Sequence, residues 1–430
     1  MPSNSNLALF GGSKAVTSPF QPYNSIGPEE RMAVDCVMST GCLSSFVGSW
    51  GPDFYGGPNV RAFEQQWADY FGVQYAISVN SWTSGLVCAV GAISIEPGDE
   101  VIVTPWTMCA TVTAILHWNA IPVFADIDPY TFNISPESVI RCITSRTKAI
   151  IAADIFGQSC DIVSLMSIAS NYDLRVITDS AQSPGAKHKD KYTSTASHIG
   201  GFSLNYHKHI HTGEGGMLVT DDIDLCTKMQ LIRNHAEAVV GSLGDHSLVN
   251  MIGHNFRMGE LEASIGIEQL KKLDCLVKSR QSAADSITRR LSSLAGLRLP
   301  FVQEDSSHVY YVYPMVLDCG VLGVRRECIV QALEAEGIQG LMSGYANIHR
   351  LPAFREKIAY GSHGFPWSLS NNPVNYDCGI CPVAEELHDH SFLGYEMCLF
   401  SMSDNEVDQF CSAFEKVWAN LPALKSYFAC

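Results

Sequence analysis

Short apolar runs alternate with helix-length segments between about residues 60 and 225 of the chain. These runs are apolar on both faces, which is typical of strands buried inside a mostly parallel sheet. The helix-length segments between them would cover the two faces of that sheet. The predicted strands are residues 76–79, 100–104, 122–126, 149–154, 175–179 and 217–220.

Several of the predicted strands end at a polar or small residue. These residues are Asn80, Pro105, Asp126, Asp154 and Asp179. In open α/β sheets, ligands bind beyond the carboxyl ends of the strands. We therefore expect a ligand site along this edge of the sheet.

The pattern changes after the predicted sheet, because apolar residues recur at helical spacing from about residue 261 to residue 295. The remaining residues mix strand-like and helical patterns. The sequence therefore predicts an α/β protein with two domains. Residues 1–295 would form a large domain with an N-terminal arm, and residues 296–430 a smaller α+β domain.

Within this smaller domain, residues 308–317 are strand-like and residues 326–336 place their apolar side chains on one helical face. Ser403 and Glu406 form a capping box that predicts the start of a further helix. Residues 360–382 are rich in Gly, Pro, Ser and Asn and predict a long loop. Loops of this length are usually functional or disordered.

The composition narrows the class of protein. Of the 430 residues, 46% are hydrophobic, which is sufficient for a large core and excludes a disordered chain. The formal net charge of −16 argues against a general nucleic-acid binder, which needs a basic face. Only 17% of the residues are charged, and this low fraction suggests that part of the surface is buried in a subunit contact.

The cysteines and the apolar runs bear on location. The 15 cysteines show no framework spacing, and the start MPSNSNLALFGG has no signal-peptide pattern. No apolar run approaches the roughly 20 residues that span a bilayer. We expect a cytoplasmic protein that does not bind a membrane.

Cys378 and Cys381 form a C-x-x-C motif near His388 and His390, but a second ligand pair is missing and no metal is expected.

The residues most suggestive of chemistry surround Lys208, which is flanked by His207, His209 and His211 in a weakly charged region. Burial and neighbouring positive character would lower the pKa of this lysine, as an imine-forming lysine requires. A purely structural lysine is an equally acceptable explanation of this segment alone. The cluster Gly213–Gly216 likewise could form only a tight turn.

Two other segments favour the chemical interpretation. Asp179 ends a predicted strand and Gln182 follows three residues later. The segment NSWTSGL places small polar residues at the start of a predicted helix, where free amides and hydroxyls can bind a phosphate. A phosphate cradle, a strand-end aspartate and a lysine are what pyridoxal phosphate requires, because the aspartate keeps the pyridine nitrogen protonated and the lysine holds the aldehyde.

At this point the chain resembles the DegT/DnrJ/EryC1/StrS aminotransferases, which are fold-type-I pyridoxal-phosphate enzymes that mostly aminate keto-sugars or keto-cyclitols. The resemblance covers nearly the whole chain. Its most specific parts are KHIHTGEGG and NFRM, and other matching segments are LALFGGSKAVTSPF, NSWTSGL, EPGDEVIVTPWT, PVFADIDPYTF and ITDSAQSPGA. It implies a mostly parallel central sheet in a large domain and a smaller C-terminal α+β domain.

The resemblance assigns roles by position. It implies that Lys208 forms the Schiff base with pyridoxal phosphate, that Asp179 pairs with the pyridine nitrogen, and that Gln182 lies against the cofactor ring. The phosphate would be held by Thr83, by Ser203 and by the backbone amide of Trp82.

Asn255 matches an asparagine that reaches the phosphate from a second subunit. The resemblance therefore implies a homodimer with shared active sites. Arg257 could bind a carboxylate or phosphate of the substrate, although a structural ion pair would explain it equally well. His349 and Arg350 are further candidates for substrate binding.

The chain departs from the family pattern at several positions. The family commonly stacks an aromatic ring on the cofactor where this chain has Met108, so either Trp106 or the thioether of Met108 is expected there. Trp82 occupies a place usually held by a small residue, where it could narrow the pocket mouth or pack in the core. The loop 361–379 is longer than in many members. A related branch has histidine in place of Lys208, so dehydration is not expected.

The resemblance implies an aminotransferase that moves an amino group from glutamate or glutamine to a keto-sugar, with a nucleotide-linked sugar as the first expectation. A keto-cyclitol or a free sugar is the alternative acceptor. A lyase or aromatising enzyme on the same scaffold is a second alternative. A regulatory protein that binds the cofactor without turnover is a third, and Lys208 together with Asp179 argues against it.

Overall fold

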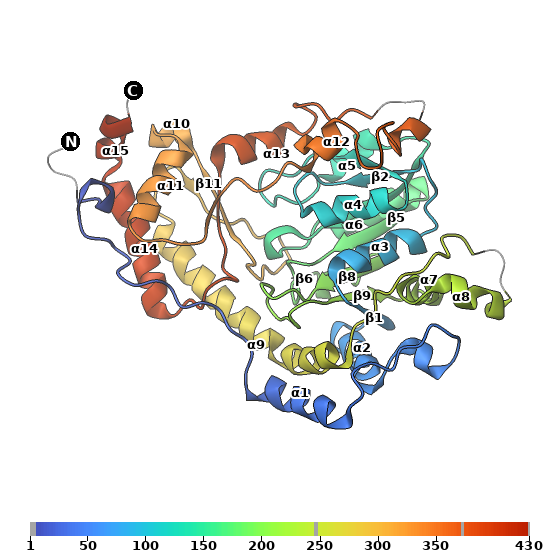
Figure 1. Cartoon of the computed structure of the whole chain (residues 1–430). Coiled ribbons are helices and arrows are strands. Elements are labelled where there is room, and N and C mark those ends of the chain that lie inside the picture. Colours follow the sequence, from blue (N-terminus) through green and yellow to red (C-terminus); the bar gives the residue numbers. More distant parts are fainter. Residues whose placement is uncertain (1–5, 245–247, 371–373, 429–430) are drawn as a thin grey trace.

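The computed structural model describes residues 6–244, 248–370 and 374–428 (Figure 1). A seven-stranded sheet with the order β1-β9-β8-β5-β4-β2-β3 forms its centre. Its strands are β1 (Tyr75–Val79), β2 (Glu100–Val103), β3 (Ile121–Phe124), β4 (Thr147–Ala153), β5 (Arg175–Asp179), β8 (Ile199–Ser203) and β9 (Gly216–Thr220). The six strands that the apolar runs predict are all present, with ends that differ by at most two residues.

The central sheet is mostly parallel, as the sequence predicts. Strands β3, β2, β4, β5 and β8 run parallel, whereas β9 is antiparallel to both β8 and β1. Sequence analysis missed β8, whose sequence IGGFS contains two glycines and is therefore a poor match to a strand pattern.

Helices cover both faces of this sheet, because alternate strand residues point to opposite sides. Val101 and Val103 pack with α3, α4 and α7, whereas Ile102 packs with α5 and α6 on the other face. Helices α2 and α9 cover the end of the sheet that holds β9 and β1. The large-sheet helices are α2 (Pro58–Phe71), α3 (Trp82–Ala92), α4 (Cys109–His117), α5 (Pro136–Cys142), α6 (Ile162–Tyr172), α7 (Ile223–Arg233) and α8 (Ala236–Val239).

A second sheet lies at the end of the molecule that also holds α14 and α15 (Figure 1). It has four antiparallel strands in the order β10-β11-β13-β12. Its strands are β10 (Leu297–Arg298), β11 (Tyr313–Leu317), β12 (Leu341–Ser343) and β13 (Phe392–Tyr395). The accompanying helices are α10 (Cys319–Leu322), α11 (Arg326–Ala335), α14 (Asp404–Ala419) and α15 (Leu421–Phe428).

The expected capping box of α14 is present, since Ser403 and Glu406 bond reciprocally to each other's backbone. Only the second half of the strand-like run at 308–317 is a strand. The first half passes beside the large sheet, where Val309 donates its N–H to the Gly157 carbonyl. Two short strands, β6 (Lys187–His188) and β7 (Lys191–Tyr192), form a separate hairpin.

Helix α9 (Glu260–Leu291) joins the two sheets, as Figure 1 shows. Leu270 and Leu273 pack in the core beside the large sheet, whereas Ile287 and Leu291 pack in the core of the small sheet. Helix α1 (Pro28–Thr40) lies along the first half of α9 and is tied to it by an ion pair between Glu30 and Lys272.

The N-terminal arm packs on the small sheet, although it precedes the large one in sequence. Leu7, Val16 and Phe20 belong to the core of the small sheet. The carboxylate of Glu336 accepts the N–H groups of Ala8 and Ala15 at 2.8 Å and 2.9 Å. The domain boundary between residues 295 and 296 stays a prediction. The N-terminal arm, which precedes this boundary in the sequence, packs on the small sheet that follows it.

The long loop predicted over residues 360–382 is packed against the large sheet in its described part. Trp367 donates to the Tyr376 hydroxyl, and this hydroxyl donates to the Pro122 carbonyl of β3 at 2.6 Å. Residues 371–373 lie outside the described part of the chain. Helices α12 (Pro352–Arg355) and α13 (Pro382–Glu386) flank the loop.

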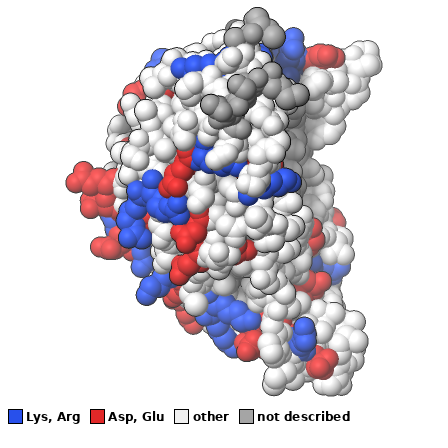
Figure 2. Space-filling model, turned by 90° about the vertical axis from the view of Figure 1, so that its left-hand side faces the viewer, with Lys and Arg blue, Asp and Glu red and all other residues white. Residues whose placement is uncertain are grey.

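Charges of both signs lie beside one another on the face shown in Figure 2, which carries no continuous basic patch. None of the helices in the described part of the chain combines the length and apolar character needed to span a bilayer. The cysteines described by the structure are free thiols, and Cys430 lies outside the described residues.

Candidate active site

Lys208 lies in the turn between β8 and β9, and its side chain is almost fully buried at 7% exposure. Burial lowers its pKa to about 8, although the negative charge of Asp179 acts in the opposite direction. Its Nζ atom lies over the ring of Tyr311, 4.4 Å from the ring centre. The amine is therefore deprotonated in a substantial fraction of molecules near neutral pH, as a nucleophilic lysine must be.

The histidines around Lys208 carry little positive charge. Burial lowers the pKa of His207 to about 4, and it also lowers the pKa of His209 well below its ordinary value. His209 is held by its Nε2 atom, 2.9 Å from the Val309 carbonyl. The low pKa of Lys208 thus has burial as its main cause, and the neighbouring positive character expected from the sequence contributes little.

Asp179 is the last residue of β5 and is 6% exposed. Its Oδ1 atom accepts a hydrogen bond from the Trp82 indole at 2.7 Å. Its Oδ2 atom accepts one from the Thr111 hydroxyl at 2.7 Å. The carboxylate is therefore held on both oxygens at the carboxyl edge of the sheet, where the sequence predicts a ligand site.

The N-terminus of α3 lies beside this carboxylate. Ser81 caps the helix by accepting the N–H of Ser84, so the first helical residues, Trp82 and Thr83, present backbone amides with no partner inside the helix. Thr83 is exposed, and Ser203 ends β8, the strand whose Gly201 touches the Trp82 ring. A helix start with hydroxyls beside it can hold a phosphate.

Gln182 is fixed beside Asp179 by two hydrogen bonds. Its Oε1 atom accepts the N–H of Phe156 at 2.8 Å, and its Nε2 atom donates to the Tyr345 hydroxyl at 3.0 Å. Burial raises the pKa of Tyr345 to about 12, so its phenol is neutral. Both polar atoms of the Gln182 side chain are thus hydrogen-bonded within the protein.

Trp106 and Met108 differ strongly in exposure. Trp106 is fully buried, packs on Phe156 and Phe392, and donates its indole N–H to Asn347 at 3.2 Å. Met108 is 58% exposed and forms the N-cap of α4. Of these two candidates for the cofactor face, Met108 is therefore the accessible one and Trp106 belongs to the core.

Asn255 and Arg257 lie next to each other at the surface, and the Nε atom of Arg257 donates a hydrogen bond to Asn255 Oδ1 at 2.8 Å. Asn255 is exposed, and the backbone of this segment is attached to the β1–α3 connection through an N–H bond from Asn80 to the Phe256 carbonyl. Both side chains are thus at the surface near the start of α3, where a second subunit could be reached.

His349 and Arg350 belong to an ion-pair network with Glu385 and Asp389. His349 is fully buried with Nε2 at 2.9 Å from Glu385, and Arg350 donates to Glu385 and to Asp389 at 2.8 Å. Burial alone would raise the pKa of Glu385, but the hydrogen bonds that it accepts from Arg350, Gly379 and His349 lower it. This geometry gives no support to the substrate roles expected for these two residues.

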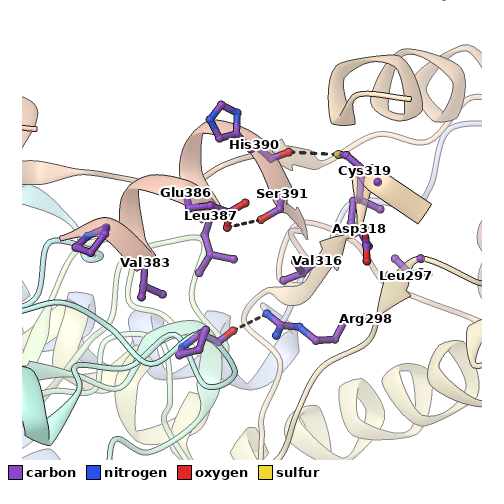
Figure 3. Close-up of a pocket in the computed structure, with 15 residues that line it drawn as sticks. Leu297, Arg298, Val316, Asp318, Cys319, Val383, Glu386, Leu387, His390 and Ser391 are labelled. Atoms are coloured by element: carbon purple, nitrogen blue, oxygen red, sulfur yellow. Dashed lines mark hydrogen bonds between the residues drawn. The ribbon is translucent and has the colours of Figure 1, made fainter. Parts of the chain in front are cut away.

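A separate cavity lies away from these residues. It has a volume of about 890 Å³ and opens between β10, β11 and α13 (Figure 3). Its polar groups are bonded to one another: Arg298 donates to the Pro129 carbonyl, and Ser391 donates to Glu386. None of the residues proposed here for the cofactor lines it, and we do not consider it the active site.

The residues around Lys208 fit pyridoxal phosphate. A buried lysine of low pKa, a strand-end carboxylate and the start of α3 are brought to one edge of the sheet, and Trp82 joins the last two directly. Thr111, Tyr311 and Tyr345 complete the surroundings and were not identified as site residues from the sequence. In the described part of the chain, no three His, Cys, Asp or Glu side chains are grouped in a way that could hold a metal ion.

The chain is similar to several known proteins. The spore coat polysaccharide biosynthesis protein SpsC of Bacillus subtilis is 34% identical over 83% of this chain and 90% of its own length. GDP-perosamine synthase of Caulobacter vibrioides is 35% identical over 73% of this chain and 80% of its own. The relatives include aminotransferases of both sugars and cyclitols.

A solved aminotransferase from Psychrobacter cryohalolentis has a similar fold, with a TM-score of 0.80 and 29% identity. The match covers 94% of this chain and 100% of that one. The sequence profile of the DegT/DnrJ/EryC1/StrS aminotransferase family matches residues 51–387. The chain therefore belongs to the DegT/DnrJ/EryC1/StrS aminotransferase family.

Proposed function

We propose that this protein uses pyridoxal phosphate to transfer an amino group from glutamate or glutamine to a keto-sugar. The observation that carries the proposal is the buried Lys208 with a pKa of about 8, placed beside Asp179 and the start of α3. When bound, pyridoxal phosphate supplies an aldehyde that condenses with amines and a ring that withdraws electrons from the adjoining carbon.

Lys208 has two tasks in this proposal. It would hold the aldehyde of the bound cofactor, and its amine, once free, would accept a proton from the donor's α-carbon and return one. A pKa of about 8 suits both tasks, because the amine can accept and then return a proton near neutral pH.

The other residues bind and orient. Asp179 would bind the protonated ring nitrogen of the cofactor, and Gln182 would contact its ring. The amides of Trp82 and Thr83 bind the phosphate with the Ser203 hydroxyl. Met108, exposed beside the start of α4, is the side chain that can pack on the open ring face.

Homodimerisation with shared active sites is part of the proposal. Asn255 is exposed and is positioned by Arg257, so it can reach the phosphate of a second copy. Four apolar side chains are exposed, namely Met32, Met38, Trp50 and Ile252. A partner subunit would cover them.

A nucleotide-linked keto-sugar is the acceptor we propose first. GDP-perosamine synthase among the relatives supports it, whereas relatives named for inosose amination support a keto-cyclitol. The two acceptors are separated by converting the bound cofactor to its amine form with glutamate and then adding each ketone. Recovery of the original absorption band with a nucleotide keto-sugar supports the proposal, and recovery only with a keto-inositol would replace it.

The cofactor assignment is tested by borohydride. Reduction of the loaded protein should fix the cofactor on the peptide that contains Lys208. Lys208→Ala should lose transamination but still bind the cofactor, whereas Lys187→Ala and Lys189→Ala should behave like the wild type. Labelling at Lys187 or Lys189 would show that the proposed site is wrong.

A further inference from the structure

Trp82 is the first residue of α3, and its side chain points into the protein with only 6% exposure. Its indole Nε1 atom donates to Asp179 Oδ1 at 2.7 Å. The same residue therefore has its backbone amide at the start of α3 and its side chain on the acid at the end of β5. These are the phosphate end and the ring end of the proposed cofactor site.

The surrounding backbone leaves room for this large ring. A Cβ atom on Gly201 of β8 would lie 2.1 Å from the Trp82 ring, and one on Gly85 of α3 would lie 2.6 Å from it. Even alanine would collide with the indole at either position. The ring thus occupies a slot between α3 and β8 that depends on glycine at both walls.

Asp179 is bonded by a second side chain on the other oxygen. The Thr111 hydroxyl donates to Oδ2 at 2.7 Å, and the N–H of Ala181 lies 3.2 Å from Oδ1. An ionised carboxylate has about four lone-pair directions, so these three donors leave room for one more. The plane of the carboxylate is therefore fixed while one position stays free for a ring nitrogen.

We infer that Trp82 is a positioning residue for Asp179, whose indole N–H, together with the Thr111 hydroxyl, holds the carboxylate in the orientation that meets the pyridine nitrogen. The inference rests on the proposed function, because it takes Asp179 as the partner of that nitrogen. It explains why a tryptophan stands where the family usually has a small residue.

Simple core packing is the competing explanation, and the chain contains a matched example of it. Trp67 of α2 is fully buried in an aromatic core with Phe63 and Phe71, and its indole N–H has no hydrogen-bond partner among the described residues. Trp67→Phe removes the same atoms as Trp82→Phe but leaves Asp179 untouched. It is therefore the control for lost volume.

The experiment compares the wild type, Trp82→Phe, Trp67→Phe and Thr111→Val as full-length proteins loaded with pyridoxal phosphate. Three quantities are measured: the dissociation constant of the cofactor, the pH midpoint of its visible absorption band, and the thermal midpoint of each apoprotein. A protonated ring nitrogen makes it harder to protonate the nitrogen that Lys208 contributes. If Asp179 is held less firmly, the ring nitrogen binds its proton less tightly. The pH midpoint of the absorption band should therefore rise.

For Trp82→Phe we expect at least a fivefold weaker affinity for the cofactor and a higher spectral midpoint, with neither change in Trp67→Phe. On an Asp179→Asn background, Trp82→Phe should add no further change to the midpoint, because the two residues act through one contact. If Trp82→Phe does not fold, Thr111→Val decides, since it removes the companion donor with little change of shape.

The inference is overturned if Trp82→Phe matches Trp67→Phe in affinity and midpoint, or if, where Trp82→Phe cannot be folded, Thr111→Val leaves both quantities at wild-type values. Failure of the proposed function has a different signature. In that case the wild-type protein itself gives no visible band and no borohydride adduct on Lys208.

Discussion

The Nζ atom of Lys208 lies 4.4 Å from the centre of the Tyr311 ring. The face of an aromatic ring attracts a cation, so this contact stabilises the ammonium form of the lysine. Burial raises the pKa of Tyr311 far above its ordinary value, and the phenol therefore stays neutral. The pKa of Lys208 thus reflects a balance between burial, which disfavours the ammonium form, and the charge of Asp179, which favours it. The face of the Tyr311 ring acts in the same direction as Asp179.

The first prediction concerns the pH dependence of cofactor capture. Only the neutral amine attacks an aldehyde, so the rate at which the cofactor-free protein binds pyridoxal phosphate should rise with pH and level off above about 8. An ordinary lysine, with a pKa of 10.5, would level off far later. Stopped-flow absorbance measures the rate, with free Nα-acetyl-lysine as control. A rate that still rises above pH 10 would contradict the low pKa.

The second prediction concerns Tyr311. Tyr311→Leu removes the ring that favours the ammonium form and should lower the pH midpoint of cofactor capture. A cation–π contact of about 0.5–2 kcal/mol corresponds to a decrease of roughly 0.4–1.5 in the pKa. Tyr311→Phe keeps the ring and is the matched control, for which we expect the wild-type midpoint. An unchanged midpoint in Tyr311→Leu would show that the contact carries no weight.

The third prediction concerns shared active sites. Lys208→Ala and Asn255→Ala subunits are each impaired alone, but a mixed dimer should contain one site with both residues intact. After random exchange of equal amounts, activity should approach about a quarter of the wild type. Mixing Lys208→Ala with Asp179→Ala is the control, because both residues are expected on the same side of one site. No recovery in the first mixture, despite proven exchange, would argue against sharing.

The fourth prediction concerns Arg350, whose ion pairs with Glu385 and Asp389 suggest a structural role. Arg350→Ala leaves Glu385, which is 10% exposed, without its main cation. The free energy of unfolding should fall by about 1–3 kcal/mol, as urea titration would show, while the KM for the keto-sugar stays within about twofold. The exposed Arg355 provides the control variant Arg355→Ala. A KM raised tenfold at unchanged stability would instead make Arg350 a substrate cation.

The central sheet was predictable because its strands are apolar on both faces, as in the run that contains Ile150, Ile151 and Ala152. The strand β8 was not, because Gly201 makes room for Trp82, Gly200 makes room for Ser194, and its pairing comes from tertiary structure. Sequence patterns report burial of a segment well, but they do not report which ring fills the space beside a glycine.

The residues of the candidate site also divide into those that a local sequence motif indicates and those that it does not. Lys208, Asp179 and Gln182 lie in motifs, and the sequence indicates them. Thr111 and Tyr311 touch two of these residues from distant segments, and no local pattern identifies them. Arg350 shows the opposite case, since a cation counted as available from the sequence is paired with carboxylates 35 and 39 residues later in the chain.

Helix α9 connects two distant parts of the molecule, the segment that follows Asn255 and the small sheet. At 1.5 Å per residue its 32 residues span about 48 Å. It begins shortly after Asn255, the residue proposed to cross into the partner, and its last turns lie in the core of the small sheet. A tilt of about 5° at its first turn would displace its far end by roughly 4 Å, given that length. Helix α9 is therefore a continuous connection between the segment that is proposed to contact a partner and the core of the small sheet.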